Sequence, residues 1–168
     1  SAVHTDINPL GGILKNFTIA QPTGVINATY NNNTINLAKS STSGAVTGIS
    51  IEGMSPALST AAINVNNNLI NSIDVSGAGS SSAITGISNS SASGVLNINN
   101  NTVRGCTSTG STAGARFTGI TNTGAVVNNI NINDNKLGDA ISGAISYSVF
   151  TNAPVYGIYN TQHPVTCS

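Results

Sequence analysis

The chain has 168 residues, of which 6% are charged and 4% are aromatic, and its five basic and five acidic residues give a net charge of zero. These charges are scattered singly, so the composition disfavours nucleic-acid binding, which needs a basic patch for the phosphates. No long apolar run or polybasic stretch indicates membrane insertion. With 39% hydrophobic residues, the chain is expected to fold as one domain with its own core.

The first elements fall in residues 1–23, where we expect a partial turn or cap, because residues 12–19 resemble a degenerate copy of later segments. Four repeats are predicted over residues 24–160, followed by a C-terminal tail at residues 161–168. The whole chain, residues 1–168, is interpreted as a single domain. Since it has neither an initiator Met nor a signal peptide, we expect a processed protein, or a segment of a longer protein or of a filament.

One box of eight residues recurs four times. Its copies begin at residues 28, 63, 96 and 130, so the successive offsets are 35, 33 and 34 residues. Apolar and polar residues alternate in the box, as Ile63 and Val65 do with Asn64, and this period of two predicts a β-strand rather than a helix. Asn, Ser and Gly are frequent between the boxes, where they favour turns.

A second element with the pattern apolar-Thr/Tyr-Gly-Ile follows each box. Its copies span residues 46–50, 84–88, 117–121 and 155–159. Two elements in each repeat of about 34 residues predict two turns of about 17 residues, and about eight to nine turns in total. The glycine of each copy is interpreted as a bend or a place of close backbone approach. These glycines are Gly48, Gly86, Gly119 and Gly157.

The likeness of the four boxes favours a solenoid over a sandwich, because residues in a solenoid stack on their equivalents in the next turn, about 4.8 Å away. Ile63, Leu96 and Ile130 are expected to form an apolar column, interrupted if a second-element turn lies between consecutive boxes. A structural ladder of side-chain amides is predicted at the corners. Its members are Asn33, Asn68, Asn101 and Asn135. A solvent-facing Asn row that binds sugar is the alternative.

The boxes, for example Ile98-Asn-Asn-Asn101-Thr-Val103, resemble the repeats of parallel β-helix domains in bacterial surface and secreted adhesin-like proteins. The resemblance covers residues 24 to 160 and implies an all-β, single-stranded, right-handed parallel β-helix. It does not imply one function, because the same fold carries polysaccharide lyases and hydrolases, phage tailspikes, adhesins and ice-binding proteins.

No catalytic, metal-binding or cofactor-binding residue is predicted. The acidic residues are too dispersed for a carboxylate pair, and the two histidines lie near opposite ends of the chain, which disfavours a metal cluster or a triad. Arg104 and Arg116 are expected near each other without a carboxylate partner. The acidic residues and histidines are Asp6, Glu52, Asp74, Asp134, Asp139, His4 and His163. Asp134 is interpreted as a variant of the column Asn32, Asn67 and Asn100.

Tyr147, Tyr156 and Tyr159 are the candidates for ligand binding, because aromatic rings near the C-terminus can stack on a surface glycan. Capping of the open end of the coil is the other interpretation of these tyrosines. A second candidate surface is a threonine column at Thr47, Thr85 and Thr118, which would suit ice binding, although Tyr156 replaces threonine in the fourth repeat.

Cys106 and Cys167 are predicted to lie about three turns apart, or about 14 Å along the coil axis. A disulfide requires Cα atoms within about 7 Å. We therefore expect free thiols, or pairing of these cysteines with another chain.

The predicted function is that of an extracellular or cell-surface structural or adhesive module without catalytic activity. Few Lys and Glu beside many Ser, Thr and Asn favour this location. A carbohydrate-binding or polysaccharide-processing β-helix protein, or an ice-binding protein, is the alternative. The expected partners are a second copy joined end to end or laterally, neighbouring repeats of the same protein, or a surface glycan.

Overall fold

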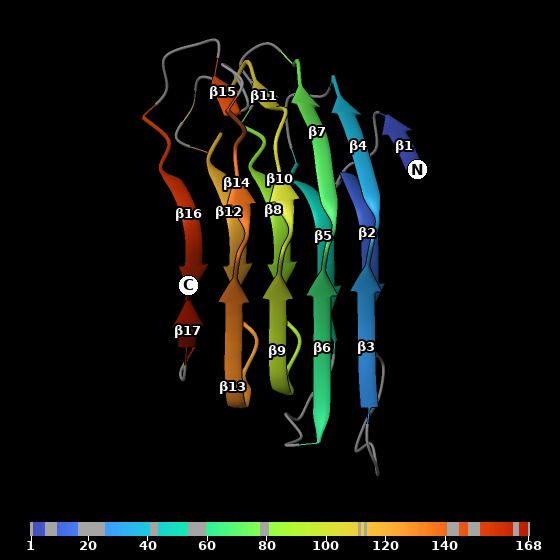
Figure 1. The fold of residues 1–168 in the computed structure, drawn as a ribbon. Coiled ribbons are helices and arrows are strands. Elements are labelled where there is room, and N and C mark those ends of the chain that lie inside the picture. The colour runs from blue at the N-terminus through green and yellow to red at the C-terminus, as the bar shows by residue number, and fades with distance from the viewer. Residues whose placement is uncertain are drawn as a thin grey trace.

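The computed structural model describes residues 2–5, 10–16, 26–40, 44–53, 60–77, 81–110, 112, 114–140, 145–147, 152–162 and 165–167. In these ranges the protein is all-β, and its strands form three parallel sheets that are stacked as a β-solenoid (Figure 1). Within the same ranges there is no helix of the length and hydropathy needed to cross a membrane.

The chain visits the three sheets in turn. Sheet A has seven strands: β1 (Ala2–Thr5), β4 (Thr34–Lys39), β7 (Leu69–Val75), β10 (Thr102–Val103), β11 (Cys106–Ser108), β14 (Lys136–Leu137) and β15 (Ile145–Tyr147). Sheet B has five: β2 (Leu10–Asn16), β5 (Val46–Glu52), β8 (Ile84–Asn89), β12 (Phe117–Asn122) and β16 (Val155–Asn160). Sheet C also has five: β3 (Ile26–Asn31), β6 (Ala61–Asn66), β9 (Ser93–Asn99), β13 (Val126–Asn133) and β17 (Val165–Cys167).

Each repeat forms one coil, not two. Ile63 pairs with Leu96, and Leu96 pairs with Ile130, so partners on adjacent strands lie one whole repeat apart. The expected two turns per repeat and eight to nine turns are therefore not confirmed. The strands of sheet C lie side by side in Figure 1, from β3 to β17, without a second-element strand between them. The apolar columns are accordingly uninterrupted.

The two elements of a repeat belong to one coil, and each box comprises two strands joined by a corner. In the second box β6 ends at Asn66, Asn67 has a φ of 58°, and β7 begins at Leu69. Asn32, Asn100 and Asp134 take the same corner position with positive φ. Asn and Asp enter this left-handed region more readily than other L residues, because their short polar side chains bond locally. Asp134 is thus a variant of the corner column, and the property that it shares with the three asparagines is its positive φ.

The core consists of inward-facing aliphatic columns. Ile63, Leu96 and Ile130 are fully buried and stack in register along sheet C. The alternating burial along β6, with the intervening residues half-buried, follows directly from the period of two in the sequence. Each such side chain contributes about 1.5–3 kcal/mol on burial.

The glycines of the second element lie where backbone and side chains approach most closely. A Cβ atom on Gly86 would stand 2.5 Å from the carbonyl oxygen of Gly119 and 2.8 Å from a methyl carbon of Val103. Gly48 meets the oxygen of Gly86 and the side chain of Ile70 in the same manner. The predicted close approach is confirmed at these positions, where an apolar side chain of sheet A fills the space that a Cβ on sheet B would take.

Candidate functional site

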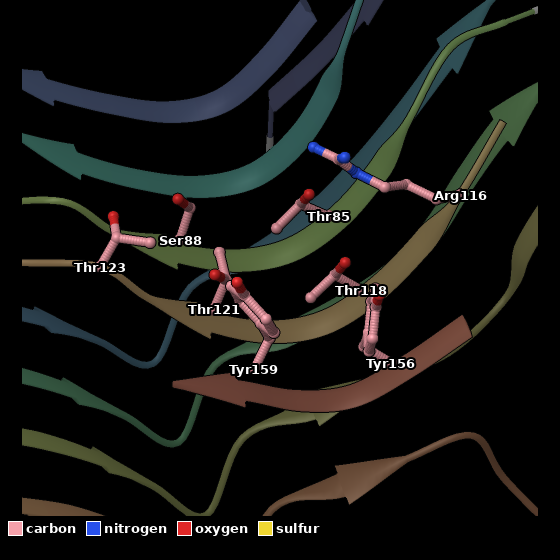
Figure 2. Close-up of a pocket in the computed structure, with 8 residues that line it drawn as sticks. All are labelled: Thr85, Ser88, Arg116, Thr118, Thr121, Thr123, Tyr156 and Tyr159. Carbon is pink, nitrogen blue, oxygen red and sulfur yellow. The ribbon is translucent and has the colours of Figure 1, made fainter. Parts of the chain in front are cut away.

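The outer face of sheet B is hollowed into a groove of about 400 Å³ (Figure 2). The groove runs across β8, β12 and β16, and nearly all of its lining residues carry a hydroxyl group. The lining residues are Thr85, Ser88, Arg116, Thr118, Thr121, Thr123, Tyr156 and Tyr159.

Strand pairing arranges these hydroxyls in rows. Thr85 pairs with Thr118, which pairs with Tyr156 one coil further on. The threonine column expected from the sequence is thus present as a geometric row, and it extends to Thr47 on β5. A parallel row joins Ser88, Thr121 and Tyr159. The neighbouring Ile84, Ile87, Phe117 and Ile120 point into the core, which fixes the outward direction of both rows.

Two of the three candidate tyrosines meet in the groove. Tyr156 and Tyr159 are 40% and 44% exposed, and their ring centroids lie 5.4 Å apart at an interplanar angle of 48°. Both side chains project from β16 toward the threonines of β12 (Figure 2). Tyr147 lies on β15 of sheet A, where it pairs with Ser108, and its side chain is outside the described residues. The pair on β16 forms an aromatic wall at one side of the groove.

The two arginines lie on different sheets and differ in their surroundings. Arg104, between β10 and β11, binds Asp139 with 2.7 Å between Nη1 and Oδ2. The expectation that no carboxylate accompanies the arginines is wrong for Arg104, because Asp139 lies one coil away and not two. This guanidinium holds the pKa of the Asp139 carboxyl below its usual range. Arg116 precedes β12, is exposed, and is the charged residue among those that line the groove.

The other described acidic residues do not line the groove, although Glu52 binds Ser50, the strand partner of the lining residue Ser88. Glu52 accepts a hydrogen bond from Ser50 at 2.8 Å, and Asp74 accepts one from Thr107 at 2.7 Å. Across the described part of the chain, His, Cys, Asp and Glu form no group of three or more that could hold a metal ion. Asp6 and His163 lie outside the described residues, as does the side chain of His4.

The predicted asparagine ladder follows the corners of the coil. The Nδ2 atoms of Asn33, Asn68 and Asn101 each donate to the Oδ1 atom of the next member, at 2.9 Å, and the last acceptor is Asn135. Asn68, Asn101 and Asn135 also donate to backbone carbonyls, those of Tyr30, Val65 and Ile98. These bonds occupy the amides within the fold, in accord with a structural ladder.

A second buried ladder was missed in the sequence. Asn89 donates to Asn122, and Asn122 donates to Asn160, both at 2.8 Å. Asn89 and Asn122 are fully buried beneath sheet B. The sequence contains this pattern, since each Asn stands two residues after the Ile of the second element, one position beyond the five residues that define the element.

Cys106 is a free thiol inside the coil. Its burial raises the pKa to about 12. The side chain of Cys167, on β17, lies outside the described residues. The described thiol is thus placed for packing and not for nucleophilic chemistry.

In the described residues, fold and surface together define a parallel β-solenoid of three sheets with an open, hydroxyl-lined groove on sheet B. Comparison of the chain with protein-family models, with curated proteins and with solved structures found no match in any of the three.

Proposed function

We propose that the protein is a non-catalytic, extracellular adhesive module that binds carbohydrate in the groove of sheet B. The observation that carries this proposal is the combination of the tyrosine wall with rows of hydroxyl groups. Tyr156 and Tyr159 each offer a half-exposed aromatic face, and the half-buried Thr85, Ser88 and Thr121 offer donors and acceptors beside it. A sugar ring has an apolar C–H face and a rim of hydroxyls, so it needs both kinds of group.

The repeating geometry favours a polysaccharide over a free monosaccharide. The two rows present equivalent side-chain positions at each strand, about 4.8 Å apart. The first row continues beyond the groove to Thr47 on β5, and the second ends at Ser50, which is buried and donates to Glu52. A polymer can therefore make several weak contacts at once, which raises its overall affinity without any single strong contact.

Two rival functions fit the groove less well. Cleavage of a glycosidic bond uses a pair of carboxyl groups beside the bond, and none of the described carboxylates lines the groove. Ice binding would require a flat and exposed threonine array. Thr118 is only 6% exposed, and Tyr156 ends the row at a raised wall. The extracellular location is supported by the low content of charged residues, 6% of the chain.

A glycan array followed by titration with the best ligand tests this function. We expect the double variant Tyr156→Ala/Tyr159→Ala to lose about tenfold or more in affinity, since an aromatic contact contributes about 0.5–1.5 kcal/mol beyond its buried area. Val127→Ala, which removes an exposed apolar side chain from sheet C, is the matched control and should bind as the wild type does. Absence of binding to every glycan, or full affinity in the double variant, would contradict the proposal.

A structural role in end-to-end assembly is the second candidate, favoured by the last coil. Val155 and Ile158 are 63% and 42% exposed, although they continue columns in which Phe117 and Ile120 are buried. Among the described strands, β16 pairs on one edge only. We propose that a further coil of the same type covers this end, from a neighbouring repeat or a second copy.

Sedimentation velocity over a range of concentrations tests the assembly of second copies. We expect the wild type to associate as concentration rises, and Val155→Asp/Ile158→Asp to remain monomeric with an unchanged circular dichroism spectrum. A wild type that stays monomeric at all concentrations would rule out assembly through a second copy.

A further inference from the structure

The charge of the groove points to the class of sugar that it takes. Arg104 is neutralised by Asp139 at 2.7 Å. Arg116 has no ion pair within the described residues, and it stands in a groove whose other lining residues are neutral. In a chain with a net charge of zero, the groove therefore carries a local positive charge.

The neighbours of Arg116 leave its side chain room to enter the groove. Since Ile84, Phe117 and Val155 are aligned across the sheet, the residues before them are equivalent, and Arg116 is flanked by the short side chains of Ala83 and Pro154. Figure 2 shows the guanidinium reaching over the sheet on the side of Thr85, while Tyr156 and Tyr159 occupy the opposite side of the β12 threonines. The groove thus has a cationic wall and an aromatic wall.

We infer that the groove selects anionic glycans. Arg116 binds the carboxylate or sulfate group of an acidic sugar, while Tyr156 and Tyr159 hold the sugar ring. The planar guanidinium suits both anions, because its N–H groups form two parallel charge-assisted bonds to a pair of oxygens. This inference rests on the proposed carbohydrate-binding function and adds the substrate class.

Matched ligands separate charge from shape. The wild-type chain is titrated with a galacturonate hexasaccharide and its methyl ester, and with a sulfated galactan hexasaccharide and its unsulfated form. We expect at least one acidic ligand to bind about tenfold more tightly than its neutral counterpart. This preference should shrink at about 0.5 M salt, because exposed charges are screened there. If only the galacturonate pair shows this preference, the group that the groove recognises is a carboxylate. If only the galactan pair shows it, the group is a sulfate.

Two variants connect the preference to Arg116. Arg116→Gln should reduce the affinity for the acidic ligand to that of its neutral counterpart and leave the neutral affinity unchanged. Lys136→Gln removes the same charge from an exposed position on sheet A, and it should keep the preference. Equal binding of acidic and neutral ligands, or an unchanged preference in Arg116→Gln, would overturn the inference.

The two proposals fail in different ways. If the four ligands do not bind but a neutral glycan binds on the array, or if acidic and neutral ligands bind equally, the anionic preference is wrong and the carbohydrate-binding function stands. If no glycan of any kind binds, both are wrong.

Discussion

The backbone nitrogen and the side-chain nitrogen of Asn68 both donate to the Oδ1 atom of Asn101, each at 2.9 Å. Asn101 makes the same two bonds to Asn135 in the next coil. Its Nδ2 atom also donates to the carbonyl of Val65 at 2.7 Å, across the corner. One amide thus joins three successive coils, and its removal would leave groups in the neighbouring coils without their partners.

Removal of this amide is the first test of the ladder. In Asn101→Ala the backbone N–H of Asn68 and the carbonyl of Val65 lose their partners inside the fold. We expect the free energy of unfolding to fall by about 2–5 kcal/mol, since each unsatisfied buried group costs about 1–3 kcal/mol. Urea unfolding followed by circular dichroism measures the change.

Asn97→Ala is the matched control for the ladder. Asn97 belongs to an outer, half-exposed row, where it donates to Asn64 and accepts from Asn131. Water can replace these partners, so we expect a loss below about 1 kcal/mol. Equal losses in the two variants would show that the buried ladder contributes no more to the free energy of unfolding than the exposed row does.

The glycine row yields a prediction about packing. Gly86→Ala places a methyl group 2.5 Å from the Gly119 carbonyl oxygen and within 2.9 Å of both methyl carbons of Val103. The backbone of adjacent coils must separate, and we expect a loss of at least about 1–3 kcal/mol. Gly157→Ala is the control, because among the described residues its added Cβ would meet Leu137 Cδ1 alone, at an ordinary contact distance of 3.6 Å. Thermal melts that rank the two variants equally would contradict this account of the row.

The buried thiol predicts a difference in reactivity. Burial raises the pKa of Cys106 to about 12, so the thiolate is scarce at neutral pH as well as shielded from solvent. We expect iodoacetamide to leave Cys106 unmodified in the native protein and to alkylate it fully in denaturant. Peptide mass spectrometry distinguishes Cys106 from Cys167. Rapid native alkylation of Cys106 would mean that this part of the coil opens readily.

The Arg104–Asp139 ion pair predicts a dependence on pH. The folded protein holds the pKa of Asp139 below the ordinary value of 3.8, so its carboxyl group binds a proton less readily than in the unfolded chain. The resulting stabilisation is present above about pH 4 and is lost as the pH falls through the folded pKa. We expect the wild type to melt above Asp139→Asn at neutral pH and the difference to vanish in acid. A difference that persists in acid would assign the effect to packing.

The sequence predicted stacking correctly but not the shape of the coil. The equivalence of Ile63, Leu96 and Ile130 was sufficient to align the strands, because like residues stack in a solenoid. A corner was predicted at the ladder residue Asn68, whereas the residue with a φ of 58° is Asn67, directly before it. The two elements of each repeat predict one turn each, although together they form a single coil that passes through three sheets.

The same error concealed part of the surface chemistry. Arg104 and Asp139 are 35 residues apart, which is one coil and not two, so their ion pair was not expected. Tyr156 and Tyr159 could be proposed as ligand-binding residues from their type and position alone. The hydroxyl rows beside them could be recognised only after the register of sheet B was known.

The contact of Gly86 with Gly119 and Val103 also restricts how the length of this protein can change. A deletion of one or two residues within a strand would place a side chain where the neighbouring coil leaves room only for hydrogen. The register of every later coil would be shifted in the same way. Insertion or removal of a complete repeat restores each glycine to its position opposite an aliphatic partner. The length of the protein can therefore change only by whole repeats.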